Sequence, residues 1–231
     1  FNEGGGGREK DGRKISNNVQ LSEKKFYSFR FEATNPGGHS SLPVRKNAIY
    51  DLSAALLAVA DYDMPVMLND VTNAFFSQTA EIIGGEMGDA LKRVLANPAD
   101  MEAVEFASQE PAYNARLRTT CVATLLDGGH AGNALPQTAT ATVNCRVLPD
   151  HLASDVARRL EALAAPHDVT VGWNGRERDS PASALDPDIM GAIEMITEQM
   201  WPGVRVVPVM LTGATDGSAL RSAGIPTYGV S

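Results

Sequence analysis

The sequence predicts a mixed fold in which an α/β layer is interrupted by an inserted α+β unit. Two segments, 25–33 and 137–147, alternate apolar and polar side chains, which is typical of strands with one buried face. A third segment, 204–211, is a nearly continuous apolar run and favours a strand buried on both faces, as in α/β domains. The chain of 231 residues therefore predicts two different kinds of sheet.

The inserted unit begins with the strand at 25–33, where Tyr27 and Phe29 share one face. A glycine-rich turn follows. A helix is then expected from about residue 43, because Pro43 suits a first helical turn and apolar residues recur at helical spacing up to residue 59. Residues 69–114 predict a set of short helices.

A hairpin, a helix and a strand complete the inserted unit. Segments 116–126 and 137–147 are expected to pair as antiparallel strands. A helix is expected at about 151–164 and a strand at 168–173. The order strand, helix, helical insert, strand, strand, helix, strand is the β-α-β-β-α-β pattern of a ferredoxin-like sandwich, which we expect to occupy residues 23–174.

The flanking segments, 1–22 and 175–231, predict one incomplete α/β domain. Residues 15–22 suggest a short strand, and 175–185 a crossing linker. Asp186 followed by Pro187 indicates a capped helix start. A strand at 204–211, a short helix from Asp216 and a final strand are expected to follow. Both ends of the chain suggest interior segments of a longer protein.

Composition narrows the function classes. The net charge of −8 argues against nucleic acid as a partner, and the apolar runs are too short for a membrane span. Cys121 and Cys145 are too few for a disulfide framework, so buried thiols are favoured, although a cross-strand disulfide is possible. His130, His151 and His167 lack ligand spacing and are interpreted as surface residues.

Several polar residues lie in loops or at strand ends. Glu3 precedes four glycines and suits a divalent ion, although a solvated loop glutamate is the commoner case. His39, between a strand and a helix, suits oxyanion stabilisation or is incidental to a capping loop. Asn133 offers a donor and an acceptor, or is a plain turn residue. Arg146 suits a bidentate carboxylate contact or a surface ion pair.

The segment from Thr212 to Ser218 joins an apolar strand to a helix. Its backbone amides, at the start of that helix, can hold an anion. The pattern is not a phosphate loop, and the alternative is a tight strand-helix turn with Asp216 as the helix cap.

Taken together, these segments resemble the M20 family of metallopeptidases and aminoacylases, in the right order along essentially the whole chain. The matching stretches are Asn2-Glu3-Gly4-Gly5, Gly37-Gly38-His39-Ser40-Ser41, Gly132-Asn133-Ala134-Leu135-Pro136, Asn144-Cys145-Arg146 and Gly213-Ala214-Thr215-Asp216-Gly217. The resemblance implies that Glu3 is a metal ligand and that His39 reaches the partner subunit's active site. It further implies that Asn133 and Arg146 hold the substrate, and that Gly213 to Thr215 form a backbone cradle.

The same resemblance implies an activity and an assembly. The activity is hydrolysis of an amide or peptide bond in a small peptide or N-acyl amino acid, by a water bound to two metal ions, usually Zn²⁺. A lid or dimerisation domain (23–174) inserted between catalytic-domain segments (1–22 and 175–231) would form a homodimer, with the helix at 43–60 and the lid strands in contact.

The resemblance also places the general base and most of the other metal ligands before Phe1, and a final histidine ligand after Ser231, so the chain alone is expected to be inactive. The alternative is a non-catalytic ferredoxin-like dimerisation or binding module. The choice between peptide and acyl-amino-acid substrates, the metal and the compartment stay open.

Overall fold

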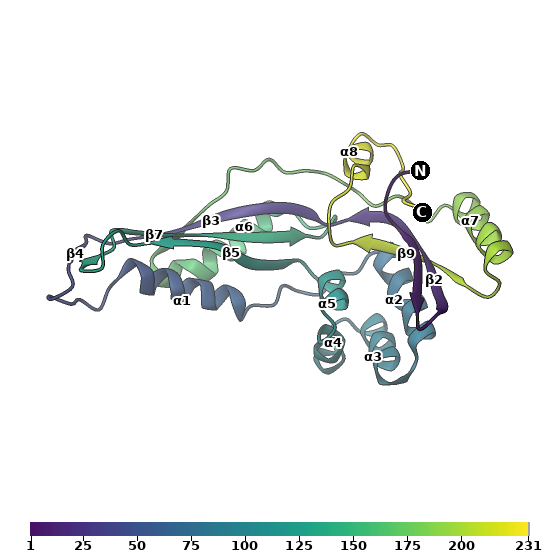
Figure 1. Ribbon diagram of the computed structural model, residues 1–231, viewed down its shortest axis with the longest axis horizontal. Coiled ribbons are helices and arrows are strands. Elements are labelled where there is room, and N and C mark those ends of the chain that lie inside the picture. The colour runs from purple at the N-terminus through teal and green to yellow at the C-terminus, as the bar shows by residue number, and fades with distance from the viewer. Residues whose placement is uncertain (231) are drawn as a thin grey trace.

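Two sheets lie one after the other along the long axis of the molecule (Figure 1). A computed structural model describes residues 1–230. The larger sheet has the strand order β5-β7-β3-β8, and the smaller has the order β1-β2-β9. A short pair, β4-β6, lies at the far end of the larger sheet (Figure 1). The mixed α/β class is confirmed.

The strands are β1 (Gly6–Lys10), β2 (Arg13–Glu23), β3 (Lys25–Thr34), β4 (Gly38–His39), β5 (Thr120–Gly128), β6 (Ala134–Leu135), β7 (Thr138–Val147), β8 (Val169–Gly172) and β9 (Arg205–Leu211). The helices are α1 (Ala48–Ala60), α2 (Asp70–Ile83), α3 (Gly85–Ala96), α4 (Met101–Ser108), α5 (Pro111–Leu117), α6 (Ala153–Ala164), a 3-10 turn (Ala165–His167), α7 (Pro187–Met200) and α8 (Gly217–Ser222). None of the helices in residues 1–230 combines the length and apolarity needed to cross a membrane.

The larger sheet is antiparallel throughout, and α1 and α6 cover one of its faces. The predicted alternation is confirmed, because Tyr27, Phe29 and Phe31 are buried against the two helices. Every second residue of β7 is buried in the same core. Full burial of an aromatic side chain contributes about 2–3 kcal/mol. The opposite face carries no helix and leaves Phe26 and Arg30 exposed. We call it the open face.

The smaller sheet pairs β2 with β1 antiparallel and with β9 parallel. Burial of β9 on both faces is confirmed. Val207 and Val209 pack against α2 to α5, whereas Val206 and Met210 belong to the core that includes residues of α7. The helices predicted at 69–114 therefore pack on the smaller sheet, although they lie within the contiguous range 23–174.

Two predicted boundaries and one predicted strand are wrong. The first helix begins at Ala48 rather than near Pro43, because the Asn47 side chain caps it by accepting from Ile49 N at 2.8 Å. The strand predicted from residue 116 begins at Thr120, since α5 extends to Leu117. The final segment, up to residue 230, forms only isolated bridges through Gly229.

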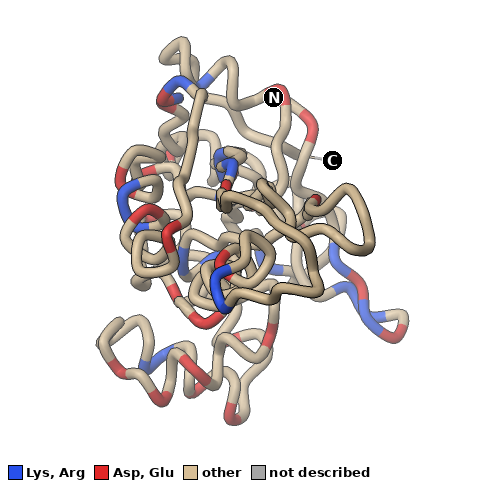
Figure 2. The backbone as a smooth tube through the Cα atoms, turned by 90° about the vertical axis from the view of Figure 1, so that its left-hand side faces the viewer, with Lys and Arg blue, Asp and Glu red and all other residues tan. Residues whose placement is uncertain are grey.

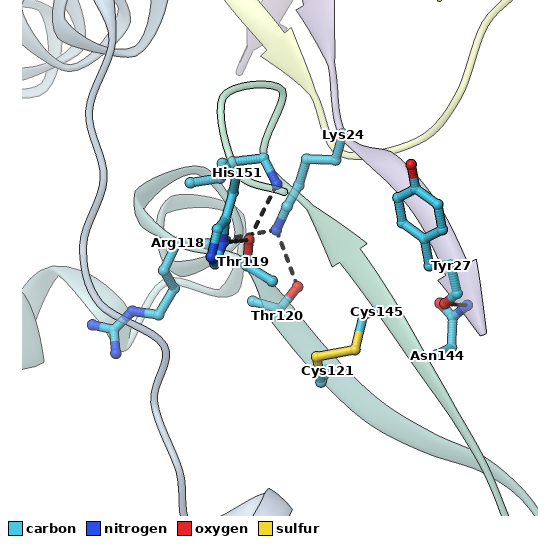
Figure 3. Close-up of a disulfide and its surroundings, with 10 residues drawn as sticks. Lys24, Tyr27, Arg118, Thr119, Thr120, Cys121, Asn144, Cys145 and His151 are labelled. Carbon is cyan, nitrogen blue, oxygen red and sulfur yellow. Dashed lines mark hydrogen bonds between the residues drawn. A yellow bond between two sulfur atoms is a disulfide. The ribbon is translucent and has the colours of Figure 1, made fainter. Parts of the chain in front are cut away.

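The preference for buried thiols is also wrong, because Cys121 and Cys145 form a disulfide between β5 and β7 (Figure 3). The two residues are direct partners in the antiparallel register, with their Cα atoms 4.1 Å apart. This separation is close to that of a non-hydrogen-bonded antiparallel pair, in which facing side chains approach each other most closely.

Lys24 joins the two sheets, since β2 ends at Glu23 and β3 begins at Lys25. Lys24 is 1% exposed, and its Nζ donates to Arg118 O at 2.8 Å and to Thr120 Oγ1 at 3.1 Å (Figure 3). Burial, followed by the positive charges of Arg146 and Arg116, lowers the pKa of Lys24 to about 7. The junction therefore holds a buried amine with weakened basicity.

His151 lies at the same junction, and the prediction that it is a surface residue is wrong. It is half-buried, and its Nδ1 lies 3.0 Å from Thr119 Oγ1 (Figure 3). Burial lowers its pKa.

Candidate functional site

His39 lies on the short β4-β6 pair, at the tip farthest from the smaller sheet (Figure 1). The side chain is exposed. Its Nδ1 accepts a hydrogen bond from Ser41 N at 3.2 Å and lies 2.8 Å from Ser41 Oγ. Because Nδ1 accepts this backbone bond, the ring proton is assigned to Nε2. That nitrogen is then free to donate to a group outside the chain.

Asn133 lies beside His39, because Ser40 N donates to Asn133 O at 2.9 Å. Asn133 is exposed as well. Gly37 has a φ of +82°, and a Cβ there would lie 2.8 Å from Gln137 Cγ, so the turn before His39 requires glycine. The structure thus brings together two of the predicted site residues on one tip.

The tip carries almost no charge. Residues 33–44 and 128–139 contain no Lys, Arg, Asp or Glu. Figure 2 shows the molecule from this end, and the loops nearest the viewer are largely tan, the colour of residues other than Lys, Arg, Asp and Glu. An exposed, uncharged tip can enter another protein surface at a low desolvation cost.

Glu3, Gly213 and Thr215 gather at the smaller sheet. Glu3 is exposed and its Oε1 accepts a long hydrogen bond from Asp216 N, at 3.4 Å. Gly213 is exposed with open space where a Cβ would lie. The backbone at Gly213 is therefore open to solvent, and its role in a substrate cradle stays a prediction.

Beneath these residues is a buried ion pair that the sequence analysis missed. Glu23 and Arg221 are 1% and 3% exposed, and their charged groups lie 3.0 Å apart. Gln20 Nε2 donates to Glu23 Oε2 at 2.7 Å and to Thr215 Oγ1 at 3.1 Å, and the Thr215 hydroxyl donates to Glu23. The Thr215 side chain is therefore committed to this network. The run Glu23-Lys24-Lys25 between two apolar strands was the signal available in the sequence.

Arg146 lies on the open face, at the end of β7 nearest the smaller sheet. Its Cζ is 4.9 Å from the centre of the Phe26 ring, and it forms no ion pair within residues 1–230. Its direct cross-strand partners are Phe26 and Thr120, and Thr120 accepts from Lys24. A guanidinium held on an aromatic ring without a carboxylate partner can bind a carboxylate from a ligand.

The predicted site residues therefore form two groups. His39 and Asn133 lie beyond Thr138 at one end of β7, and Arg146 lies at the other end. At about 3.4 Å per residue, the strand separates these ends by roughly 27 Å. One copy of the chain cannot bring His39 to its own Arg146 without breaking the sheet.

The predicted metal site can be compared with the donor atoms that the described residues provide. Across residues 1–230 no group of three or more His, Cys, Asp or Glu side chains could hold a metal ion. Glu3 is a single carboxylate, so the described residues do not by themselves fit a two-metal site, which needs several ligands around each ion.

The fold is that of a two-sheet protein, and the predicted site residues lie at both ends of its larger sheet. We call the end of this sheet that carries β4 and β6 the arm. The family model described as "Peptidase dimerisation domain" matches residues 21–171, and the chain therefore belongs to the M20 peptidase family. The matched residues include the whole of the larger sheet up to Val171.

Curated relatives agree with this assignment. The chain is 26% identical over 203 residues to the N-fatty-acyl-amino acid synthase/hydrolase PM20D1 of Homo sapiens, covering 86% of this chain and 40% of that protein. It is 24% identical over 201 residues to the probable carboxypeptidase S-like 2 of Dictyostelium discoideum, covering 86% and 38%. The chain thus spans about 40% of the length of the curated relatives it matches.

Solved structures show the same fold. An M20 family metallo-carboxypeptidase, Sso-CP2 from Sulfolobus solfataricus, superposes with a TM-score of 0.57 at 14% identity, covering 92% of this chain and 59% of that one. A putative amidohydrolase/peptidase from Burkholderia cenocepacia gives a TM-score of 0.52 at 10% identity, covering 92% and 42%.

Proposed function

We propose that this chain forms the lid and part of the catalytic domain of a metal-dependent hydrolase. The reaction is cleavage of an amide or peptide bond in a small peptide or an N-acyl amino acid. The family assignment supports this proposal, as do the names of the relatives, which are a fatty-acyl-amino acid hydrolase and a carboxypeptidase.

The observation that carries the proposal is the position of His39 at the end of an arm, with Nδ1 bonded to Ser41 and Nε2 free. The arm holds His39 roughly 27 Å from Arg146 of the same chain. His39 therefore serves the site of a second copy. There its Nε2–H donates to the oxyanion that forms when the amide carbonyl is attacked, and Asn133 beside it orients the same substrate.

The other predicted residues serve the site of their own copy. Arg146 binds the substrate carboxylate, and the backbone of Gly213 to Thr215 lies along the substrate. Glu3 is one metal ligand. The proposed cofactor is a pair of Zn²⁺ ions, whose remaining ligands lie outside this chain.

The domain division that accompanies this proposal is 1–22 and 175–231 for the catalytic domain and 23–174 for the lid. We assign the lid to the ferredoxin-like type. The sheet order β5-β7-β3-β8, with α1 and α6 on one face, supports that assignment. The helices α2 to α5 are then an insert that packs back on the catalytic segment.

The proposed partner is a second copy, and the edge strand β5 supports this choice. Val122, Leu125 and Leu126 on β5 are 58–68% exposed, and Tyr50 and Leu57 on the neighbouring α1 are 65% and 64% exposed. Apolar groups gathered on a strand edge and an adjacent helix mark a surface that associates with another protein.

The test uses the full-length parent enzyme. His39→Ala is expected to lower turnover by about 100- to 1,000-fold, the range for loss of an oxyanion donor, without changing the circular dichroism spectrum. His130→Ala, in the exposed loop of the same tip, is the matched control and should retain activity.

Mixing subunits tests whether His39 acts in the partner. Glu3→Gln subunits supply an intact His39, and His39→Ala subunits supply an intact catalytic segment. Random exchange makes half of the dimers mixed, each with one complete site, so activity should recover to about a quarter of the wild-type value. Full turnover in His39→Ala would contradict the proposal. A full-length protein without amidase activity would favour the alternative, a non-catalytic dimerisation module.

A further inference from the structure

A cavity of about 300 Å³ opens between β3 and the segment that follows β8. Aromatic packing and a hydrogen bond fix the position of its walls. Trp173 packs edge-on against Tyr27 with ring centres 5.8 Å apart, and tilted against Phe29 at 6.0 Å. Arg178 N donates to Tyr27 Oη at 2.9 Å, which fixes the segment beside β3. The cavity is therefore part of the fold, formed where β8 ends and leaves one edge of the first half of β3 without a strand partner, while β7 pairs with the other edge.

The lining is strongly basic in a protein of net charge −8. Arg30, Arg176 and Arg178 line the cavity, and no Asp or Glu does. Arg30 is paired with Glu32 at 2.5 Å. Arg176 and Arg178 form no ion pair within the described residues.

Glu177, which lies between these two arginines in the sequence, makes its contacts outside the cavity. Glu177 accepts from Ala153 N at 3.0 Å and Ser154 N at 3.2 Å, at the start of α6, and lies 3.7 Å from Lys25 Nζ. A carboxylate at a helix N-terminus is well stabilised there. Glu177 is therefore unavailable to neutralise its neighbours, and the cavity keeps two uncompensated guanidinium groups.

Phe26 connects this cavity to Arg146. The Phe26 side chain lines the cavity, and the Arg146 guanidinium lies 4.9 Å from the centre of the same ring. A ligand held at Arg146 thus has an aromatic surface beside it, followed by a cavity whose charged lining groups are all guanidinium donors.

We propose that this cavity receives the side chain of the amino acid whose α-carboxylate is bound by Arg146, and that Arg176 and Arg178 select an acidic side chain. The substrate class is an N-acyl or peptidyl derivative of glutamate or aspartate. The inference rests on the proposed function, because it takes Arg146 as the residue that holds the α-carboxylate. Phe26 contacts the methylene groups, and the arginines provide paired N–H donors for the second carboxylate.

The test compares two ligands of nearly equal size, N-acetyl-L-glutamate and N-acetyl-L-glutamine, by titration calorimetry on the 231-residue chain at constant ionic strength. The wild type is expected to bind the glutamate derivative about tenfold more tightly, as a charge-assisted contact requires. The double variant Arg176→Gln/Arg178→Gln should bind the two ligands within about twofold of each other. Arg13→Gln, on the smaller sheet, is the matched control and should keep the wild-type ratio.

The ratio of the two affinities tests this inference, and the effect of Arg146→Gln tests the function on which it rests. Equal affinities in the wild type, or a ratio that survives in the double variant, would overturn the inference. Arg146→Gln should weaken both ligands by the same factor. If it weakens neither while the ratio still depends on Arg176 and Arg178, the role assigned to Arg146 is wrong and the cavity alone is the site for the acidic group.

Discussion

Replacing Lys24 with methionine should change how the stability of the protein depends on pH. The lysine pKa falls from its ordinary value of 10.5 to about 7, chiefly because the amine is buried. Between these values the unfolded chain binds one more proton than the folded chain. The free energy of unfolding of the wild type therefore rises with pH across this window, by up to about 1.4 kcal/mol per pH unit. The contribution is complete above pH 10.5 and is lost as pH falls to about 7.

The magnitude follows from the shift. A shift of about 3.5 units corresponds to roughly 4–5 kcal/mol over the whole window, and a range of two pH units samples about 2–3 kcal/mol of it. Lys24 is 1% exposed, so solvent screens little of this effect. Lys24→Met also removes the donor to Arg118 O and Thr120 Oγ1, which costs about 1 kcal/mol for each bond at any pH. The pH-dependent part is therefore separable from the packing change.

Urea unfolding at several pH values between 7.5 and 9.5 measures both parts. The difference in unfolding free energy, wild type minus Lys24→Met, should grow by about 2–3 kcal/mol in favour of the wild type over this range. Lys10→Met, an exposed lysine on β1, is the control and should give a difference that does not vary with pH. Parallel curves for wild type and Lys24→Met would refute the argument that burial weakens this amine.

Three further outcomes are expected. Cys121→Ala/Cys145→Ala should lower the unfolding free energy by about 3 kcal/mol, because the disulfide closes a loop of 24 residues in the unfolded chain; a reductant should reproduce this loss in the wild type and leave the variant unaffected. Glu23→Gln leaves Arg221 buried without its charge partner and should cost about 3–5 kcal/mol, so an unchanged urea midpoint would contradict the assignment of a buried ion pair. Leu125→Arg places a charge on the exposed edge of β5 and should shift the proposed dimer to monomer in light scattering; an unchanged dimer would show that β5 lies outside the interface.

The parts of the fold that the sequence predicts correctly are those encoded by one segment at a time. Alternation along β3 and β7 is a property of a single strand, and so is the apolar run of β9, because burial follows the two-residue period of the pleat. The capped helix start at Asp186 and Pro187 is equally local, and the structure confirms it.

The incorrect and missing parts depend on contacts between distant residues. The disulfide requires the register that places Cys121 opposite Cys145, and a slip of one residue would point the side chains to opposite faces. The pairing of Glu23 with Arg221 joins residues far apart in the chain, and no local pattern encodes it. The wrong helix start near Pro43 is an exception, because the preference for proline and the Asn47 cap that outweighed it are both local.

The predicted site residues illustrate both cases. Motifs in the sequence indicate His39, Asn133 and Arg146 individually. The division of these residues between the two ends of β7 follows from the pairing of β4 with β6 and of β7 with β3, which only the structure gives.

The long arm has a mechanical consequence. If the larger sheet turned as a rigid body about its junction with the smaller sheet, a rotation of roughly five degrees at Lys24 would move a tip roughly 27 Å away through about 2 Å. A displacement of 1 Å at a reacting group is enough to change a rate about a hundredfold. In the proposed dimer, substitutions at the buried junction would therefore alter turnover in the neighbouring copy while leaving every residue at the tip intact.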